Sequence, residues 1–284
     1  MGDVVRKFSI KVKQAGSLNS LIGKELPLLP AIAVRDAMKR RDIRINGERV
    51  QSNLLLKPGD EVELFTAYPM NSIPVLFENG DCVVVNKPAG LNTDENESSS
   101  YSLIAWARER SGTGEAPALV HRLDNQTSGL VIIAKHTQAE RALLLAIQNH
   151  QMTKQYISLV KGSPIPQSAV RTAWLLKDAA AARVSISANE LTGSKKIITE
   201  YAVMESGPVS RLNVTLHTGR THQIRAHLAY LKHPVLGDEV YGDRGFNRAY
   251  RARSLKLCAF RLSFEMDHPL VSLRGLSFEI VPPF

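Results

Sequence analysis

One carboxylate in this chain combines a charged neighbour with a loop position that suits chemistry. Asp124 follows Arg122 by two residues and precedes the small, hydrogen-bonding residues 127–129 and an apolar stretch at 130–134. A carboxylate that a guanidinium keeps ionised can act as a nucleophile or as a general base. An aspartate that caps a turn or pairs with an arginine has the same neighbours, and composition alone favours this structural role.

A second segment, residues 218–227, contains His222 and His227. Five residues separate them, which places them about 140° apart on a helix, so they do not form a metal pair of the i, i+4 kind. The apolar spacing predicts a helix over 221–231 with Thr221 as its N-cap. Arg220 then lies just before the helix and is free to reach a carboxylate elsewhere.

Tyr156 lies near the start of a predicted strand at 155–160. Such a tyrosine usually packs in the core, although a ring beside a site can also stack on a base. The sequence has no phosphate-binding glycine loop, no dinucleotide fingerprint and no zinc-protease motif. Its two cysteines exclude a disulfide scaffold and a cysteine-based zinc ribbon. We therefore predict neither a cofactor nor a metal.

The chain has 284 residues and a formal charge of +9, from 36 basic and 27 acidic residues. The segment 211–261 holds ten of the basic residues and three of the acidic ones, and Tyr241, Phe246 and Tyr250 lie among its arginines. A single arginine is most often solvated surface, but this mixture suits phosphate contacts and base stacking. A polyanionic partner is predicted, with RNA, DNA and acidic lipid as the candidates.

Residues 1–66 are predicted to form a small α/β module. It has a basic helix at 31–41, a hairpin around the Asn46-Gly47 turn and a strand at 61–65. A proline-containing linker follows at 67–75, and residues 76–284 form the second domain. The longest apolar runs are too short to cross a bilayer, so we expect a cytoplasmic protein without a membrane partner.

The second domain shows many strand patterns and few helix patterns. Helices are predicted at 102–110, 138–149 and 221–231. Strands are predicted at 82–86, 130–134, 155–160, 168–176, 182–188, 197–204 and 209–216. Strands in runs indicate an α+β fold with a mixed, largely antiparallel central sheet.

The segment 121–130 resembles the central signature of the RluA family of RNA pseudouridine synthases. Four further segments resemble that family's motifs in the same order, at 81–91, 154–162, 218–242 and 257–269. The module 1–66 resembles the small RNA-binding module of ribosomal protein S4. The resemblance implies a sheet of the pseudouridine synthase type that follows an S4-like module.

The resemblance also implies an isomerase, an intramolecular transferase that converts uridine in ribosomal RNA or tRNA to pseudouridine without a cofactor. Asp124 would attack the sugar or deprotonate it, Arg220 would pair with Asp124, and Tyr156 would stack on the base and accept its proton. The residues expected to contact RNA are Arg122, Arg35, Lys39, Arg40, Arg41, Arg225 and Leu257. Arg122 would fill the space that the base vacates, and Leu257 would form a packing wall.

Two alternatives remain at this point. One is a non-catalytic RNA-binding or ribosome-assembly protein on the same fold, and the other is a DNA-binding protein. The complete set Asp124, Tyr156 and Arg220 favours the enzyme. We expect it to act as a monomer.

Overall fold

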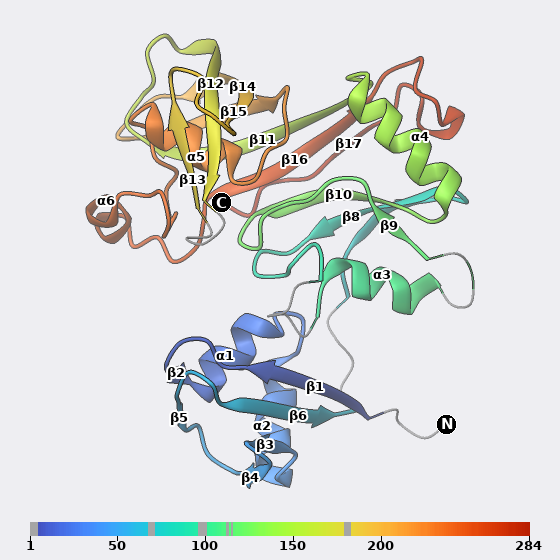
Figure 1. The fold of residues 1–284 in the computed structure, drawn as a ribbon, viewed down its shortest axis with the longest axis vertical. Coiled ribbons are helices and arrows are strands. Elements are labelled where there is room, and N and C mark those ends of the chain that lie inside the picture. The colour runs from blue at the N-terminus through green and yellow to red at the C-terminus, as the bar shows by residue number, and fades with distance from the viewer. Residues whose placement is uncertain (1–4, 68–71, 96–100, 112–113, 115, 179–182) are drawn as a thin grey trace. The chain divides into compact units, whose positions relative to one another are not determined.

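A computed structural model of the chain describes residues 5–67, 72–95, 101–111, 114, 116–178 and 183–284 (Figure 1). The chain divides into two compact units. The N-terminal unit comprises residues 1–74 and 90–117, and the C-terminal unit comprises residues 75–89 and 118–284. Residues 68–71 of the expected linker and residue 182 of one predicted strand lie outside the described residues.

The N-terminal unit is built on a four-stranded antiparallel sheet in the order β1-β6-β3-β4. Its elements are β1 (Arg6–Lys11), β2 (Gly16–Ser17), α1 (Leu18–Glu25), α2 (Ala31–Arg40), β3 (Ile43–Ile45), β4 (Glu48–Val50), β5 (Leu55–Leu56), β6 (Glu61–Thr66) and α3 (Leu103–Ser111). The φ angles of Asn46 and Gly47, 52° and 85°, confirm the predicted hairpin turn. The predicted basic helix is α2, which ends at Arg40.

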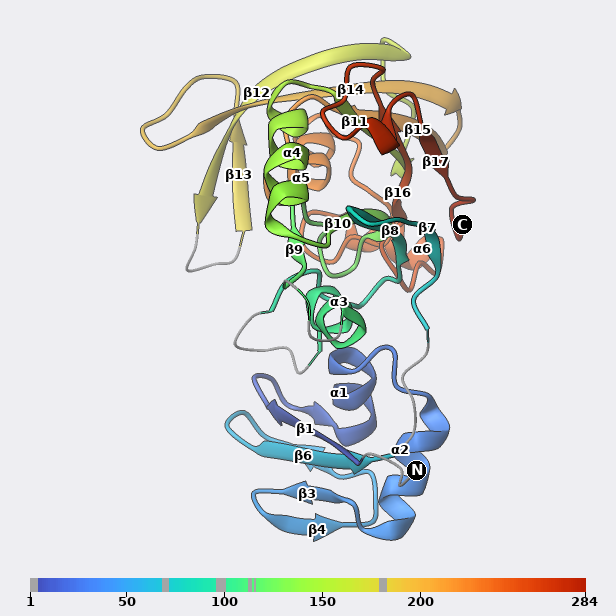
Figure 2. The same ribbon diagram turned by 90° about the vertical axis from the view of Figure 1, so that its right-hand side faces the viewer.

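The C-terminal unit is built on an 11-stranded sheet (Figure 2). The strands follow the order β13-β12-β14-β15-β11-β16-β10-β8-β7, with β17 on β16 and β9 on β10. Every pair is antiparallel except β10 with β16. This sheet is mixed and largely antiparallel, as predicted.

The bounds of the strands are β7 (Val75–Glu78), β8 (Cys82–Lys87), β9 (Ala118–Leu119), β10 (Ser128–Ala134), β11 (Met152–Lys161), β12 (Ser168–Asp178), β13 (Arg183–Ser187), β14 (Lys195–Glu205), β15 (Val209–Leu216), β16 (Leu257–Phe264) and β17 (Ser277–Glu279). The helices are α4 (Thr137–Gln148), α5 (Gln223–Tyr230) and α6 (Arg244–Ala249), and a short 3-10 turn, η1, spans Val271–Leu273. The seven predicted strands are all observed, with ends shifted by a few residues. The strands β7, β9, β16 and β17 and the helix α6 were not predicted.

The core of the C-terminal unit lies where helices cover the sheet. All seven residues of β10 are buried, which explains its continuous apolar run. Leu143 of α4 and Ile132 of β10 belong to one buried hydrophobic cluster, and Ala226 of α5 and Ile197 of β14 belong to another. No helix in the described part of the chain is long and apolar enough to cross a membrane.

Gly129 is required where β10 meets β16. The two strands pair in parallel with Gly129 opposite Ala259, and the φ angle of Gly129 is 122°. A Cβ atom at this position would lie 2.3 Å from the carbonyl oxygen of Ala259. The absence of a side chain therefore lets the two backbones approach each other five residues after Asp124.

We expect Gly129→Ala to destabilise the C-terminal unit by about 3 kcal/mol or more, because the new methyl group overlaps backbone atoms in a strained conformation. Gly80→Ala is the control, since a Cβ there meets nothing within 4 Å. Urea unfolding is followed by the fluorescence of Trp174 on β12, in a Trp106→Phe background. Equal unfolding midpoints for the two variants would show that the close approach is not needed.

Candidate active site

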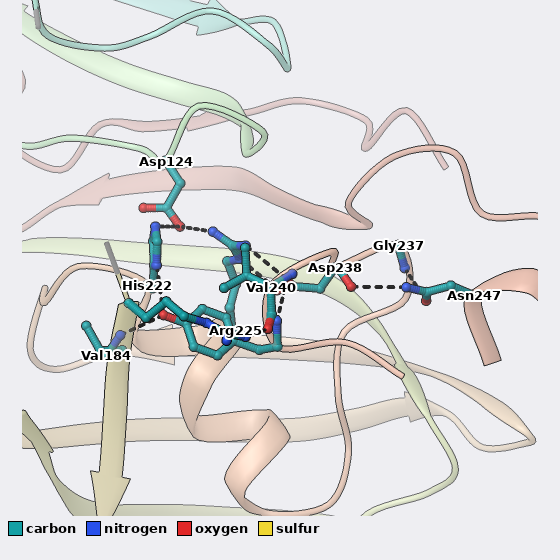
Figure 3. Close-up of polar contacts among 10 residues, drawn as sticks. Asp124, Val184, His222, Arg225, Gly237, Asp238, Val240 and Asn247 are labelled. Atoms are coloured by element: carbon teal, nitrogen blue, oxygen red, sulfur yellow. Dashed lines mark hydrogen bonds and ion pairs between the residues drawn. The ribbon is translucent and has the colours of Figure 1, made fainter. Parts of the chain in front are cut away.

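Asp124 lies in the turn that leads into β10. Its carbonyl oxygen accepts the backbone N–H of Thr127 at 3.0 Å, which fixes the turn. The Asp124 side chain is 22% exposed, so a ligand can reach it. Its Oδ2 accepts a hydrogen bond from Nη1 of Arg225 at 3.1 Å (Figure 3). The carboxylate therefore faces a guanidinium, as the sequence suggested, but a different one.

Arg225, on α5, binds two carboxylates at once. Its Nε and Nη2 donate to Oδ2 and Oδ1 of Asp238 at 2.7 and 2.9 Å, and its Nη1 reaches Asp124. Both Arg225 and Asp238 are buried. Burial raises the pKa of Asp238, but the hydrogen bonds and charge of Arg225 outweigh it, and the net shift is downward. Asp238 is therefore held ionised against the guanidinium.

The loop that carries Asp238 is fixed by its own backbone and by α6. Oδ1 of Asp238 accepts the N–H groups of Val240 and Tyr241 at 2.8 and 2.9 Å. Asn247 of α6 donates to the Asp238 carbonyl at 3.0 Å and accepts the N–H of Gly237 at 2.8 Å (Figure 3). The buried acid therefore has partners on all of its polar groups, which offsets the cost of burial.

The expectation that Arg220 pairs with Asp124 is wrong. Arg220 is exposed, and its side chain makes no ion pair or hydrogen bond within the described ranges. The helix begins at Gln223 rather than at Thr221, and its N-cap is His222. Arg225 therefore falls on the buried side of the first turn and takes the place expected of Arg220.

Arg225 was expected among the RNA-binding residues, and this assignment is also wrong. Its side chain is 8% exposed and its donors are directed at Asp124 and Asp238. A guanidinium bound in this way is not available to a phosphate. A basic surplus in the sequence does not distinguish a buried arginine from a solvated one, so this pairing could not be found from charge alone.

Tyr156 and Leu257 are both buried in the sheet beside the site. Tyr156, on β11, lies opposite Val214 and Ala259. Burial, and then the negative charge of Asp124, raise the pKa of Tyr156 well above its usual range. The phenol is therefore kept neutral, and the negative charge of Asp124 contributes to this effect. Leu257 is the first residue of β16.

Lys87 is a residue of this site that the sequence reasoning missed. It ends β8, is fully buried, and donates to the carbonyl oxygens of Pro88 and Asn125 at 3.0 and 3.1 Å. Burial lowers its pKa to about 7, and the charge of Asp124 opposes this shift. The signals available in the sequence were its place directly after the end of the predicted strand 82–86 and within the segment 81–91 that resembles a family motif.

The other expected RNA contacts lie on exposed surface. Arg122 is exposed beside Asp124 in the C-terminal unit. In the N-terminal unit, α2 buries Ala33 and Ala37 and exposes the basic residues Arg35, Lys39, Arg40 and Arg41, the last of which caps the helix. Among the residues described, no three acidic, histidine or cysteine side chains gather as a metal site would require.

Comparisons with known proteins agree on one kind of relative. The model of a family described as RNA pseudouridylate synthase matches residues 81–230, more than half of the chain. A Bacillus subtilis protein, named an uncharacterized RNA pseudouridine synthase, is 32% identical over 225 residues, which cover 74% of this chain and 73% of that protein. Ribosomal large subunit pseudouridine synthase C of Haemophilus ducreyi is 28% identical over 294 residues, which cover 93% and 88%.

The fold is similar to solved structures of the same kind. The protein described as human RNA pseudouridylate synthase domain containing 1 aligns with a TM-score of 0.61 and 25% identity, over 76% of this chain and 87% of that one. The predicted fold class is confirmed by this similarity.

We expect Arg225→Gln to destabilise the C-terminal unit by about 3–5 kcal/mol, because Asp238 is left buried without its cation. Arg220→Gln is the matched control, and its effect is expected within about 0.5 kcal/mol because the side chain is exposed. The free energies of unfolding of both variants are measured by urea unfolding, with the fluorescence of Trp174 as the probe. A larger loss for Arg220→Gln than for Arg225→Gln would contradict the assignment of the pair.

Proposed function

Because the chain belongs to the RNA pseudouridylate synthase family, it is an enzyme that isomerises uridine in RNA, and we propose that Asp124 is the carboxylate that carries the reaction. The observation that supports this role is the guanidinium of Arg225, which the buried Asp238 holds 3.1 Å from Asp124. The charge-assisted hydrogen bond fixes the position and orientation of the carboxylate.

The reaction is an exchange of bonds within one nucleotide. The bond between N1 of uracil and C1′ of the ribose breaks, the base turns, and a bond forms between C5 and C1′. The hydrogen on C5 leaves as a proton and N1 gains one, so no oxidant or energy source is consumed. In the proposed mechanism the ionised Asp124 attacks C1′ or removes a proton from the sugar, and both routes require a carboxylate within contact distance of the ribose.

The neighbouring residues are proposed to hold the target uridine. The base must leave its stack before the ribose can reach a partly buried carboxylate, and this costs on the order of a few kcal/mol. Arg122, exposed beside Asp124, is positioned to occupy the vacated space. Tyr156 packs against the base, and its raised pKa supports contact as a neutral phenol more than proton acceptance as a phenolate. Leu257 forms part of the wall.

RNA recognition is proposed to involve two basic surfaces. Residues 1–66 would be an S4-like RNA-binding module, 67–75 a linker and 76–284 the catalytic domain of a monomer, with 90–117 as a segment of that domain that belongs to the N-terminal compact unit. In the module, the basic residues of α2 would contact phosphates. In the catalytic domain, the exposed arginines of α6 and the residues after it do the same, and the exposed Tyr250 can stack on a base.

A ribosomal substrate is proposed from the relatives. The Haemophilus ducreyi protein is named for the large ribosomal subunit and covers nearly the whole of this chain. Large-subunit ribosomal RNA is therefore the first substrate to test and tRNA the second, and the enzyme is proposed to act in the cytoplasm.

We expect Asp124→Asn to lower the rate of pseudouridine formation by at least about a hundredfold, whether the carboxylate is a nucleophile or a base. The assay measures tritium released to water from transcripts of large-subunit ribosomal RNA and tRNA labelled at C5 of uridine. Asp267→Asn, at an exposed aspartate, is the matched control and should retain full activity. If the native protein binds these RNAs but releases no tritium, it is a non-catalytic RNA-binding protein on this fold.

We expect the double variant Lys39→Gln, Arg40→Gln to weaken RNA binding about tenfold and to reduce the slope of log K against log salt by up to about two. Its rate constant at saturating RNA should not change, since α2 is proposed to hold RNA and not to react with it. Lys195→Gln, Lys196→Gln removes the same charge from exposed positions of β14 and serves as the control. Equal losses in the two double variants would show only a general effect of net charge.

A further inference from the structure

His222 is held in a backbone conformation that non-glycine residues seldom adopt. Its φ angle is 54°, in the left-handed region. The neighbouring Gln223 is 2% exposed and locks this turn. Its side-chain amide accepts from the hydroxyl of Thr218 and the N–H of Arg220, and donates to the carbonyl of Ile198 and the hydroxyl of Thr199, at 2.9 to 3.1 Å. Strain maintained in this way is characteristic of functional positions.

The contacts of the His222 ring support an assignment of the nitrogen that carries its proton. Nδ1 lies 3.0 Å from the hydroxyl oxygen of Tyr241, and that oxygen accepts the backbone N–H of Val184 at 2.9 Å. With the amide as donor to the oxygen, the one hydroxyl hydrogen is available to Nδ1. We assign that hydrogen to the bond with Nδ1, and on this assignment the neutral ring carries its own proton on Nε2.

Nε2 of His222 faces Asp124. It lies 3.9 Å from Oδ2, the same oxygen that accepts from Arg225 (Figure 3). Both donors therefore address Oδ2, and no residue in the described ranges bonds to Oδ1. The separation of 3.9 Å is longer than a hydrogen bond, and such contacts commonly tighten when the substrate binds.

Tyr241 is itself fixed, so its hydroxyl is a stable partner. The guanidinium carbons of Arg225 and Arg183 lie 5.4 and 5.7 Å from the centre of its ring. The ring meets the imidazole of His222 edge to face, with centres 5.6 Å apart. Burial and the charge of Arg225 lower the pKa of His222, against the charges of Asp124 and Asp238, which favours the neutral ring.

We propose that His222 is a positioning residue that donates Nε2–H to Oδ2 of Asp124 and so leaves Oδ1 to meet the ribose. The inference deepens the proposed function and rests on it, because it assigns the reacting oxygen of Asp124. The contacts form a series: the backbone N–H of Val184 meets the hydroxyl of Tyr241, that hydroxyl meets Nδ1 of His222, and Nε2 of His222 faces the carboxylate of Asp124.

Two substitutions at His222 distinguish the role of Nε2 from that of Nδ1. The amide of His222→Gln reaches the position of Nε2 and can still donate to Asp124, whereas that of His222→Asn reaches only the position of Nδ1. We expect the single-turnover rate constant on the C5-tritiated ribosomal transcript to fall about thirtyfold in His222→Asn and no more than about fivefold in His222→Gln, with the Kd for RNA unchanged in both. Asparagine tolerates the left-handed conformation well, so a lower rate in this variant is not a folding defect.

Tyr241→Phe removes only the hydroxyl, and we expect about a fivefold lower rate constant. Tyr230→Phe, at an exposed tyrosine of α5, is its control. Equal rate constants in His222→Asn and His222→Gln would overturn the proposal. Tritium release by the native protein together with its loss in Asp124→Asn would leave the proposed function intact in that case.

A second measurement is independent of turnover. The ¹⁵N NMR shifts of the histidine rings report which nitrogen of His222 is protonated. We expect the Nε2–H form in the native protein and a shift toward Nδ1–H in Tyr241→Phe. An Nδ1–H or doubly protonated ring in the native protein at neutral pH would overturn the proposal even if no RNA substrate were found.

Discussion

A single guanidinium shared by two carboxylates is the interaction on which the site depends. Asp238 is buried and takes two donors of Arg225, and Asp124, nearer the surface, takes a third. Neither Arg225 nor Asp238 can be buried alone without a cost of several kcal/mol. The fold must therefore bring α5, the loop of Asp238 and the turn of Asp124 together, and the proposed reacting carboxylate receives its cation as a result.

Three local features hold these elements in their relative positions. Gly129 lets β10 lie directly against β16, which fixes the strand that follows Asp124. Gln223 ties the start of α5 to β14 through Ile198 and Thr199. Asn247 joins α6 to the loop of Asp238. Because α6 carries exposed arginines, RNA held there would contact the same loop that orients Arg225.

The sequence predicted seven of the eleven strands of the C-terminal sheet, because long alternating or apolar runs have one dominant interpretation, but it missed β7, β9, β16 and β17 and the helix α6. The residues around Asp124 made it a candidate but favoured a structural role, and only the resemblance to the family gave it a catalytic one. The sequence could not identify Arg225, because a buried and a solvated arginine are identical in sequence and only the observed start of α5 separates them. Lys87 was missed for the same reason, since its burial follows from the pairing of β8 with β10.

The residue at which α5 begins decides which arginine pairs with Asp124. Arg220 is nearer to the predicted cap, but the helix begins later, after the left-handed His222. Arg225 is then directed into the unit and Arg220 into solvent. His222, Asp238 and Tyr241 gain their roles from contacts between segments up to about a hundred residues apart, which no local pattern encodes.

The most direct test is a crystal structure of the Asp124→Asn variant bound to an RNA that contains a target uridine. The account predicts that the side chain at position 124 lies within about 3.5 Å of C1′ or C2′ of a flipped nucleotide, with Arg225 still bound to Asp238. A ribose bound away from position 124, or Arg225 released from Asp238 to bind a phosphate, would contradict it.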